Sequence, residues 1–283
     1  MATLRQLRTR VASVKSIQRV TNAMQLVAAA RVRRAQAHIL AARPYALKLD
    51  QVLQQLSAGM GEDRHPLLRE RPVERVAVAV VTADRGLCGG FNASICRHAL
   101  AELDAYEVGG VDVVAVGRKG RDFFRSRDYT IGREYTDVFR ELAFGQAVAI
   151  AEDLTGRFMS GEADRVVVMF NEFVSIAQQR PVTVQLLPIV PEAAEAGGVE
   201  YLFEPGPERL LDALVPRYVN FQVWRALLES NAGEQAARMA AMDNATRNAG
   251  DLVEALTREM NKVRQSSITL ELMDIIGGAE AVA

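Results

Sequence analysis

A glycine-rich segment carries the residues of this chain that are best placed to do chemistry. It reads Asp84–Arg85–Gly86–Leu87–Cys88–Gly89–Gly90 and lies between an apolar run, Val76–Val81, and a helical pattern, Asn92–Leu103. Loops between a strand and a helix are where α/β proteins cradle phosphates, because the helix N-terminus attracts anions. The spacing is neither G-x-G-x-x-G nor G-x-x-x-x-G-K-S/T, so it favours a structural glycine turn and leaves a nucleotide site as the alternative.

Polar side chains at this loop have simpler expected roles. Asn92 or Ser94 is expected to cap the helix that follows. Asp84 and Arg85 are expected to pair with each other or with a partner. None of these residues has the spacing of a catalytic pair, and we assign no catalytic residue to the chain.

Two cysteines and a histidine lie in the same neighbourhood. Cys88, Cys96 and His98 match no zinc-binding spacing, so the pattern favours buried thiols and a surface histidine over a metal site. Two cysteines are too few to form a disulfide scaffold. So low a cysteine content is typical of proteins in a reducing compartment. We therefore assign no metal and no cofactor.

The charge of the chain is unevenly distributed although its net value is only −1. No acidic residue precedes Asp50, so residues 1–49 carry +10 and the remainder carries −11. Such a block could be a nucleic-acid arm or the polar face of a coiled coil, and the single aromatic residue in it, Tyr45, disfavours RNA stacking. The ten basic residues are Arg5, Arg8, Arg10, Lys15, Arg19, Arg31, Arg33, Arg34, Arg43 and Lys48.

The hydrophobic pattern divides the chain into three segments: 1–58, 72–205 and 209–283. The first is expected to be one helix that Pro44 kinks or interrupts and that Gly59–Met60–Gly61 ends. Its apolar residues recur at helical, coiled-coil-like spacing. They are Leu4, Leu7, Val11, Val14, Ile17, Val20, Met24 and Val27.

The middle segment predicts a Rossmann-like α/β domain with a largely parallel sheet, because apolar strands alternate with helical patterns. Its longest aliphatic run, Val76–Val81, is far too short to span a bilayer. The expected strands are Val76–Val81, Val111–Val116, Val166–Phe170 and Val182–Leu187, and the expected helices are Asn92–Leu103, Arg118–Arg127 and Phe139–Met159.

The last segment predicts a second long helix that Gly277–Gly278 would end. One helix enters the middle domain and the other leaves it, so they should pair as an antiparallel coiled coil. The longer C-terminal helix should extend past its partner, and another protein should surround its bare apolar end. The expected heptad seam is Met239, Met242, Thr246, Ala249, Val253, Leu256, Met260, Val263, Ser267 and Leu270, and the apolar end is Leu270, Leu272, Met273, Ile275 and Ile276.

Three motifs in this order resemble the gamma-subunit family of F-type ATP synthases. They are residues 16–30 (SIQRVTNAMQLVAAA), the Asp84–Gly90 loop, and residues 238–249 (RMAAMDNATRNA) continued by 261–272 (NKVRQSSITLEL). The resemblance covers the whole chain and is of the bacterial type. It implies a central rotor stalk within a ring of alpha and beta subunits, a foot that holds epsilon and sits on the membrane c-ring, and no bound cofactor.

The resemblance also implies partner contacts at particular positions. Met24, Arg238 and Gln265 match residues that face beta-subunit loops, with Met242 and Arg264 beside them. The apolar end at Leu272, Ile275 and Ile276 would turn inside the ring. Asn22 and Leu270 depart from the family pattern, where lysine and glutamine are common.

The resemblance further implies a peripheral position on the cytoplasmic face of the bacterial membrane, with no membrane insertion and no nucleic acid bound. A Rossmann-like nucleotide-binding enzyme with a helical dimerisation arm stays as the alternative.

Overall fold

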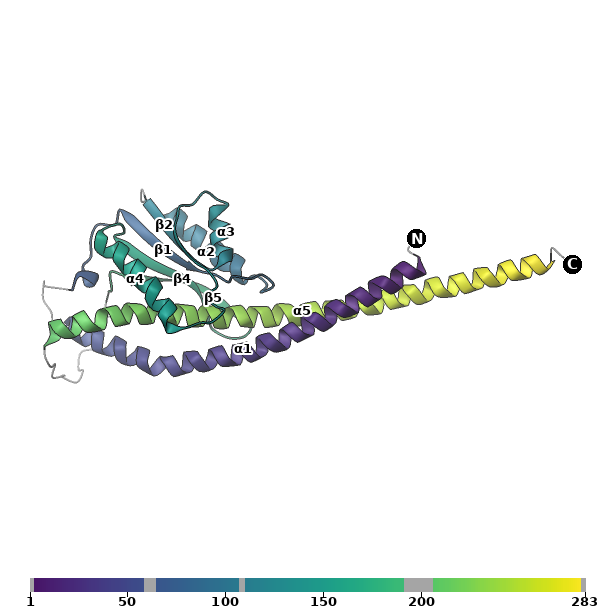
Figure 1. The fold of residues 1–283 in the computed structure, drawn as a ribbon, viewed down its shortest axis with the longest axis horizontal. Coiled ribbons are helices and arrows are strands. Elements are labelled where there is room, and N and C mark those ends of the chain that lie inside the picture. Colours follow the sequence, from purple (N-terminus) through teal and green to yellow (C-terminus); the bar gives the residue numbers. More distant parts are fainter. Residues whose placement is uncertain (1–2, 59–64, 107–109, 191–205, 281–283) are drawn as a thin grey trace. The chain divides into compact units, whose positions relative to one another are not determined.

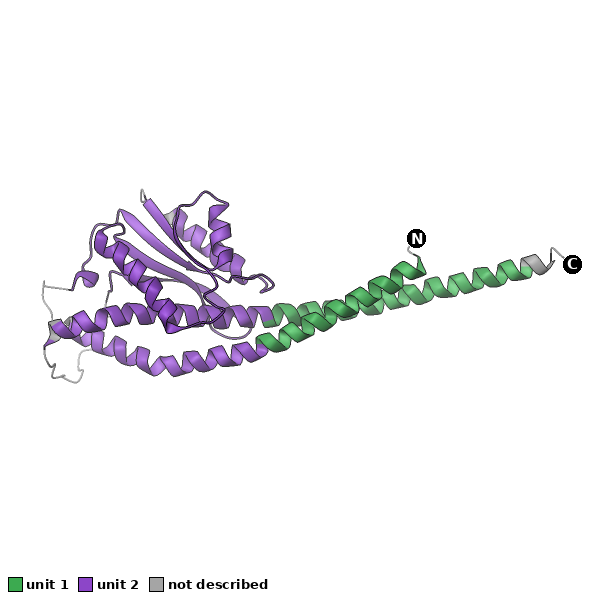
Figure 2. Cartoon of the chain, viewed as in Figure 1, with its two compact units in different colours: residues 1–28, 239–283 green, residues 29–238 purple. Residues whose placement is uncertain are grey.

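A computed structural model describes residues 3–58, 65–106, 110–190 and 206–280. The chain forms two compact units (Figure 2): unit 1 comprises residues 1–28 and 239–283, and unit 2 comprises residues 29–238. Both units contain parts of two long helices, α1 (Leu4–Ala58) and α5 (Pro207–Glu280). The predicted segments 1–58, 72–205 and 209–283 are consecutive stretches of sequence, whereas the two units are groups of residues in contact. The predicted division therefore stays a prediction.

Unit 2 contains a five-stranded sheet in the order β3-β2-β1-β4-β5. Strand β1 pairs parallel with both β2 and β4, β2 pairs parallel with β3, and β5 pairs antiparallel with β4. The predicted α/β class and largely parallel sheet are therefore confirmed. The strands are β1 (Arg75–Val81), β2 (Gly110–Val116), β3 (Ile131–Tyr135), β4 (Arg165–Phe173) and β5 (Gln179–Leu187).

Each face of this sheet has its own hydrophobic core. Alternate residues of β1 point to opposite faces: Ala77 belongs to the cluster that includes residues of α4 and α5, and Val78 to the cluster that includes residues of α2 and α3. This burial on both faces explains the continuous apolar runs in the strands. The helices of these layers (Figure 1) are α2 (Phe91–Ala105), α3 (Arg118–Arg125) and α4 (Phe144–Ser160), and a short 3₁₀ turn spans Pro66–Leu68.

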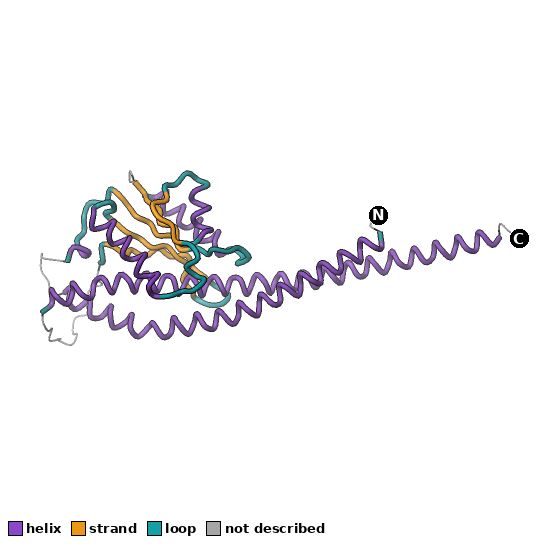
Figure 3. Tube along the Cα trace, viewed as in Figure 1, coloured by secondary structure: helices purple, strands orange, loops and turns teal. Residues whose placement is uncertain are grey.

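Unit 1 is an antiparallel pair of helices (Figure 3), because Leu7 of α1 packs with Leu256 of α5 whereas Gln25 bonds to the earlier residue Asp243. The predicted seam of α5 is buried or half-buried from Met239 to Ser267, but Leu270 is 64% exposed. The seam of α1 keeps strict 3-4 spacing, with every member buried or half-buried. Its residues in unit 1 are Leu4, Leu7, Val11, Val14, Gln18, Thr21, Gln25 and Ala28.

The seam predicted for α1 was partly wrong. Ile17, Val20 and Val27 are 53 to 55% exposed, because between Gln18 and Gln25 the seam itself is polar. In that stretch the hydroxyl of Thr246 donates to Thr21 Oγ1 over 2.7 Å, and the Gln25 side chain donates to Asp243 over 3.0 Å. In this stretch of α1 the apolar residues therefore lie on the exposed face of the helix, and polar residues face α5.

Other boundaries also differ from expectation. Pro44 lies inside α1 without interrupting it, and α5 continues through Gly277–Gly278 to Glu280. Helix α4 begins at Phe144, five residues after the expected start, because residues 137–141 form a turn. Strand β3 was not predicted at all. The expected end of the first helix at Gly59–Met60–Gly61 lies outside the described residues.

Among the described helices, none is both long enough and apolar enough to cross a membrane.

Candidate functional site

The Asp84–Gly90 loop is tied down by its first carboxylate. Asp84 Oδ1 accepts hydrogen bonds from the backbone amides of Arg118 at 3.1 Å and Asp137 at 3.0 Å. The Arg118 guanidinium lies 3.8 Å away, and the Asp84 side chain is only 10% exposed. Asp84 thus joins the loops that follow β1, β2 and β3, and of the two expected alternatives its charged neighbour in the structure is Arg118 and not Arg85.

Asn92 closes the other side of this loop. Its Oδ1 accepts from the Ala83 amide at 2.8 Å, and its Nδ2 donates to Cys88 Sγ at 3.2 Å. The expected helix cap at Asn92 or Ser94 is therefore wrong, because Gly90 occupies the N-cap position and no side chain bonds to the helix amides. Gly89 adopts a φ of 56°, which glycine accommodates without steric cost. These internal bonds favour the structural turn over a phosphate cradle.

Arg238 of α5 lies against the same loop. Its Nη1 donates to the carbonyl oxygen of Gly86 at 2.7 Å, and its Nη2 donates to Glu234 Oε1 at 2.5 Å. The side chains of Arg238 and Glu234 are 11% and 6% exposed. Of the residues matched to the family motifs, Arg238 and Gly86 are therefore brought together although 152 positions separate them.

The two cysteines lie in different apolar clusters of unit 2. Cys96 packs with Val76 and Ile95, whereas Cys88 packs with Phe91. Both thiols are buried, as predicted, and His98 bonds to Thr183 Oγ1 at 2.9 Å. Burial raises the pKa of Cys96 to about 11 and also raises the pKa of Cys88.

Cys96 is expected to react slowly with thiol reagents in the folded chain. With its pKa moved from 9.0 to about 11, its thiolate fraction at pH 8 should fall about 100-fold. A Cys88→Ser variant isolates Cys96, and its labelling rate at pH 8 should be compared in buffer and in urea. Equal rates in the two solvents would contradict the buried thiol.

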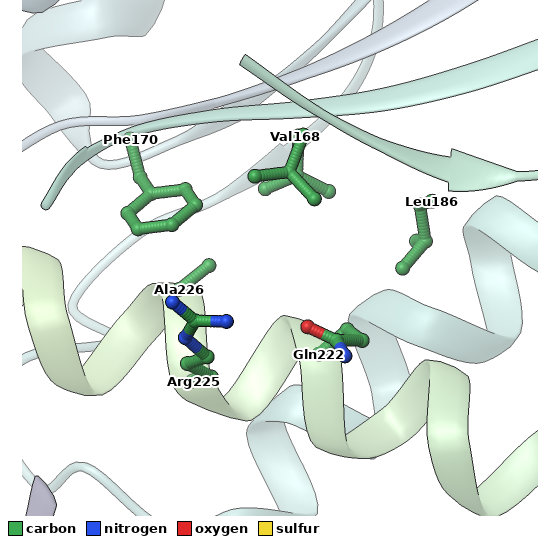
Figure 4. Close-up of a pocket in the computed structure, with 7 residues that line it drawn as sticks. Val168, Phe170, Leu186, Gln222, Arg225 and Ala226 are labelled. Atoms are coloured by element: carbon green, nitrogen blue, oxygen red, sulfur yellow. The ribbon is translucent and has the colours of Figure 1, made fainter. Parts of the chain in front are cut away.

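A small cavity lies between the sheet and α5 of unit 2 (Figure 4). Its volume is about 10 Å³, which is the space of one water molecule and far below the hundreds of cubic ångströms that a nucleotide needs. Arg225 at its edge donates to Glu229 at 3.1 Å and lies 3.9 Å from Glu172. The other lining residues are Val168, Phe170, Val184, Leu186, Gln222 and Ala226.

The C-terminal part of α5 presents apolar side chains to solvent. Leu272, Ile275 and Ile276 are 54 to 67% exposed, as the predicted overhang requires. Arg264 and Gln265 are also exposed. The further exposed apolar residues of this end are Ile268, Leu270 and Met273.

The other residues matched to partner contacts are less accessible. Met24 is half-buried, and Met242 is only 5% exposed within unit 1. A direct contact at Met242 would require the two helices to separate. Sequence reasoning missed Glu234, although its position four residues before Arg238 on a helix was a readable signal for an ion pair.

Comparisons with known proteins find relatives along the whole length of the chain. The ATP synthase family model matches residues 3–282. An ATP synthase gamma chain of Prosthecochloris aestuarii is 48% identical, covering 100% of this chain and 99% of its own. One of Desulforamulus reducens is 49% identical, covering 100% of each chain.

Solved structures share the fold at low sequence identity. One chain in a Euglena gracilis mitochondrial ATP synthase structure aligns with a TM-score of 0.69 and 19% identity, covering 99% of this chain and 94% of that one. A chain in the central stalk and c-ring structure of the Tetrahymena thermophila mitochondrial ATP synthase aligns with a TM-score of 0.61 and 24% identity. The alignment covers 80% of this chain and 99% of that one. Family model and full-length relatives agree, and the chain belongs to the ATP synthase gamma chain family.

Proposed function

We propose that this chain is the central rotor subunit of an F-type ATP synthase, which couples ion flow through the membrane ring to ATP synthesis or hydrolysis by rotation. The observation that carries the proposal is the full-length relationship to ATP synthase gamma chains at 48 to 49% identity. Two features of unit 1 support it. Its helices pair along a continuous seam, and the end of α5 extends past its partner with bare apolar side chains.

The partners of this rotor are the alpha and beta subunits of the catalytic ring, the epsilon subunit and the c-ring. We assign the ring contact to Leu272, Ile275 and Ile276, whose exposed apolar surface suits low-specificity contact during turning. Exposed Arg264 and Gln265 add exchangeable polar contacts, and Met24 adds a half-buried one. The exposed basic residues of α1, among them Arg8, Arg31 and Arg33, would face acidic loops of the ring.

The chemistry of ATP belongs, in this proposal, to the beta subunits. The present chain then needs no catalytic residue, cofactor or metal of its own, and the internally bonded Asp84–Gly90 loop supports this assignment. It binds no nucleic acid and does not enter the bilayer. Its place is peripheral, on the cytoplasmic face of a bacterial membrane.

Co-expression with alpha, beta and epsilon subunits tests the proposal. We expect the purified chain to be retained by the ring and to be required for sustained ATP hydrolysis by it. Isothermal titration calorimetry of the chain alone with ATP and NAD is expected to give no binding heat. Nucleotide binding by the lone chain, without retention by the ring, would instead favour the Rossmann-like enzyme.

A further inference from the structure

Two adjacent rows of side chains run along α1 in unit 1. The apolar row is exposed and consists of Ile17, Val20 and Val27. The polar row is buried or half-buried and consists of Gln18, Thr21 and Gln25. Neighbouring residues of an α-helix point about 100° apart, so burial of apolar surface alone would turn α1 by one residue position and pack the apolar row against α5. Other contacts must therefore determine the phase of α1, which is the face that it turns toward α5.

The polar row makes directional contacts with α5. The hydroxyl of Thr246 donates to Thr21 Oγ1 over 2.7 Å, and Thr21 in turn donates to the carbonyl oxygen of Gln18 over 3.1 Å. The Gln25 side chain donates to Asp243 Oδ1 over 3.0 Å. Hydrogen bonds need a particular distance and direction, whereas apolar contacts do not, so these bonds specify which face of α1 meets α5.

A glycine in α5 makes room for the third member of the polar row. A β-carbon built on Gly250 would come within 3.1 Å of Gln18 Nε2, which is tighter than an ordinary van der Waals contact. Glycine inside a helix lowers the stability of that helix relative to alanine. The missing side chain of Gly250 therefore leaves space for Gln18 at the expense of helix propensity in α5.

We propose that the polar row is a phase lock, whose contacts with α5 prevent α1 from turning by one residue position and keep the apolar row on the exposed face. On either side of this stretch the seam of α1 is apolar, at Val14 and at Ala28, and burial fixes the phase there. Between these two residues burial favours the opposite phase, and hydrogen bonds decide. The lock acts within the chain and does not depend on the proposed rotor function.

The solvent exposure of the Ile17 methyl group in the full isolated chain tests the lock. The measurement is the NMR relaxation of isoleucine δ1-methyl groups by a soluble gadolinium chelate, with Ile275 at 67% exposed and Ile150 at 1% exposed as references. Removing both bonds in the double variant Thr21→Ala/Gln25→Ala is expected to shift the balance between the two phases about 30-fold toward the turned one. Relaxation at Ile17 should then fall from close to the Ile275 value toward the Ile150 value.

Two further variants separate the lock from a general loss of packing. Thr257→Ala removes a half-buried hydroxyl of unit 1 that donates to the Val253 carbonyl of its own helix over 2.7 Å, so it should leave relaxation at Ile17 unchanged. Adding Val20→Ala and Val27→Ala to the double variant removes most of the burial that favours turning. Relaxation at Ile17 should then return to its wild-type value.

Two results would overturn the inference. Unchanged relaxation at Ile17 in Thr21→Ala/Gln25→Ala would mean that the continuity of the helix alone holds the phase. A rise at Ile17 would mean that the polar row holds the two helices together and does not set their phase. Retention of the chain by the alpha–beta ring is measured separately, so failure of the lock and failure of the proposed function are distinguishable.

Discussion

Replacing Asp84 with alanine is expected to lower the free energy of unfolding of unit 2 by about 3 to 5 kcal/mol. The change leaves the amides of Arg118 and Asp137 without their acceptor, and it removes the carboxylate beside the Arg118 guanidinium. Hydrogen bonds to a charged acceptor are each worth about 1.5 to 3 kcal/mol, and here two are lost together. Urea titration followed by the fluorescence of Trp224, which packs edge-on against Phe144 in the same unit, would measure the loss.

Two further variants make this prediction specific. Asp122→Ala removes a carboxylate that is 56% exposed and pairs only with neighbouring Arg121 among the contacts of the described chain, so its effect should stay within about 0.5 kcal/mol. Asp84→Asn keeps one acceptor oxygen without the charge, so its loss of unfolding free energy should lie between those of Asp84→Ala and Asp122→Ala. An Asp84→Ala chain as stable as Asp122→Ala would mean that water replaces the carboxylate at no cost.

The parts of the fold that the sequence revealed were those with a regular physical pattern. Strands buried on both faces must be apolar throughout, so β1 and β2 were visible as valine-rich runs. The seam of α5 was visible because the 3-4 repeat of apolar residues follows from the geometry of paired helices.

Patterns failed where the burial itself is irregular. Strand β3 is an edge strand that is half-buried only at Ile131 and Tyr135, so no alternation marked it. In α1 the polar seam residues Gln18 and Thr21 lie beside exposed Ile17 and Val20. A prediction that assigns the apolar residues to the helix interface therefore selects the exposed face in this stretch.

The loop motif illustrates a different limit. Its residues could be recognised as a family signature, but their roles depend on partners far along the chain: 53 positions separate Asp84 from Asp137, and 152 separate Gly86 from Arg238. No local spacing reports such contacts. The motif therefore pointed to the right loop while the contact of Arg238 with it came only from the fold.

Replacing Leu7 with alanine should disrupt unit 1 while leaving unit 2 folded. Leu7 is fully buried and forms a cluster with Val11 and Leu256, so its truncation should cost about 2 to 4 kcal/mol of local stability. Within the described part of unit 1, this cluster of buried apolar residues joins the N-terminal end of α1 to α5, so the loss should fall on the helix ends. Hydrogen exchange in residues 3–17 and 253–263 should therefore accelerate strongly.

The matched control is Leu26→Ala, which truncates the same residue type on the same helix at a side chain that is 64% exposed. It should leave exchange in both peptides unchanged, and neither variant should move the urea midpoint reported by Trp224, because that residue belongs to unit 2. In the assembled ring, Leu7→Ala should then hydrolyse ATP more slowly than Leu26→Ala, since a rotor must transmit torque through paired helices. Equal rates, with the helix ends shown to be open by exchange, would mean that α5 alone carries the torque at this level.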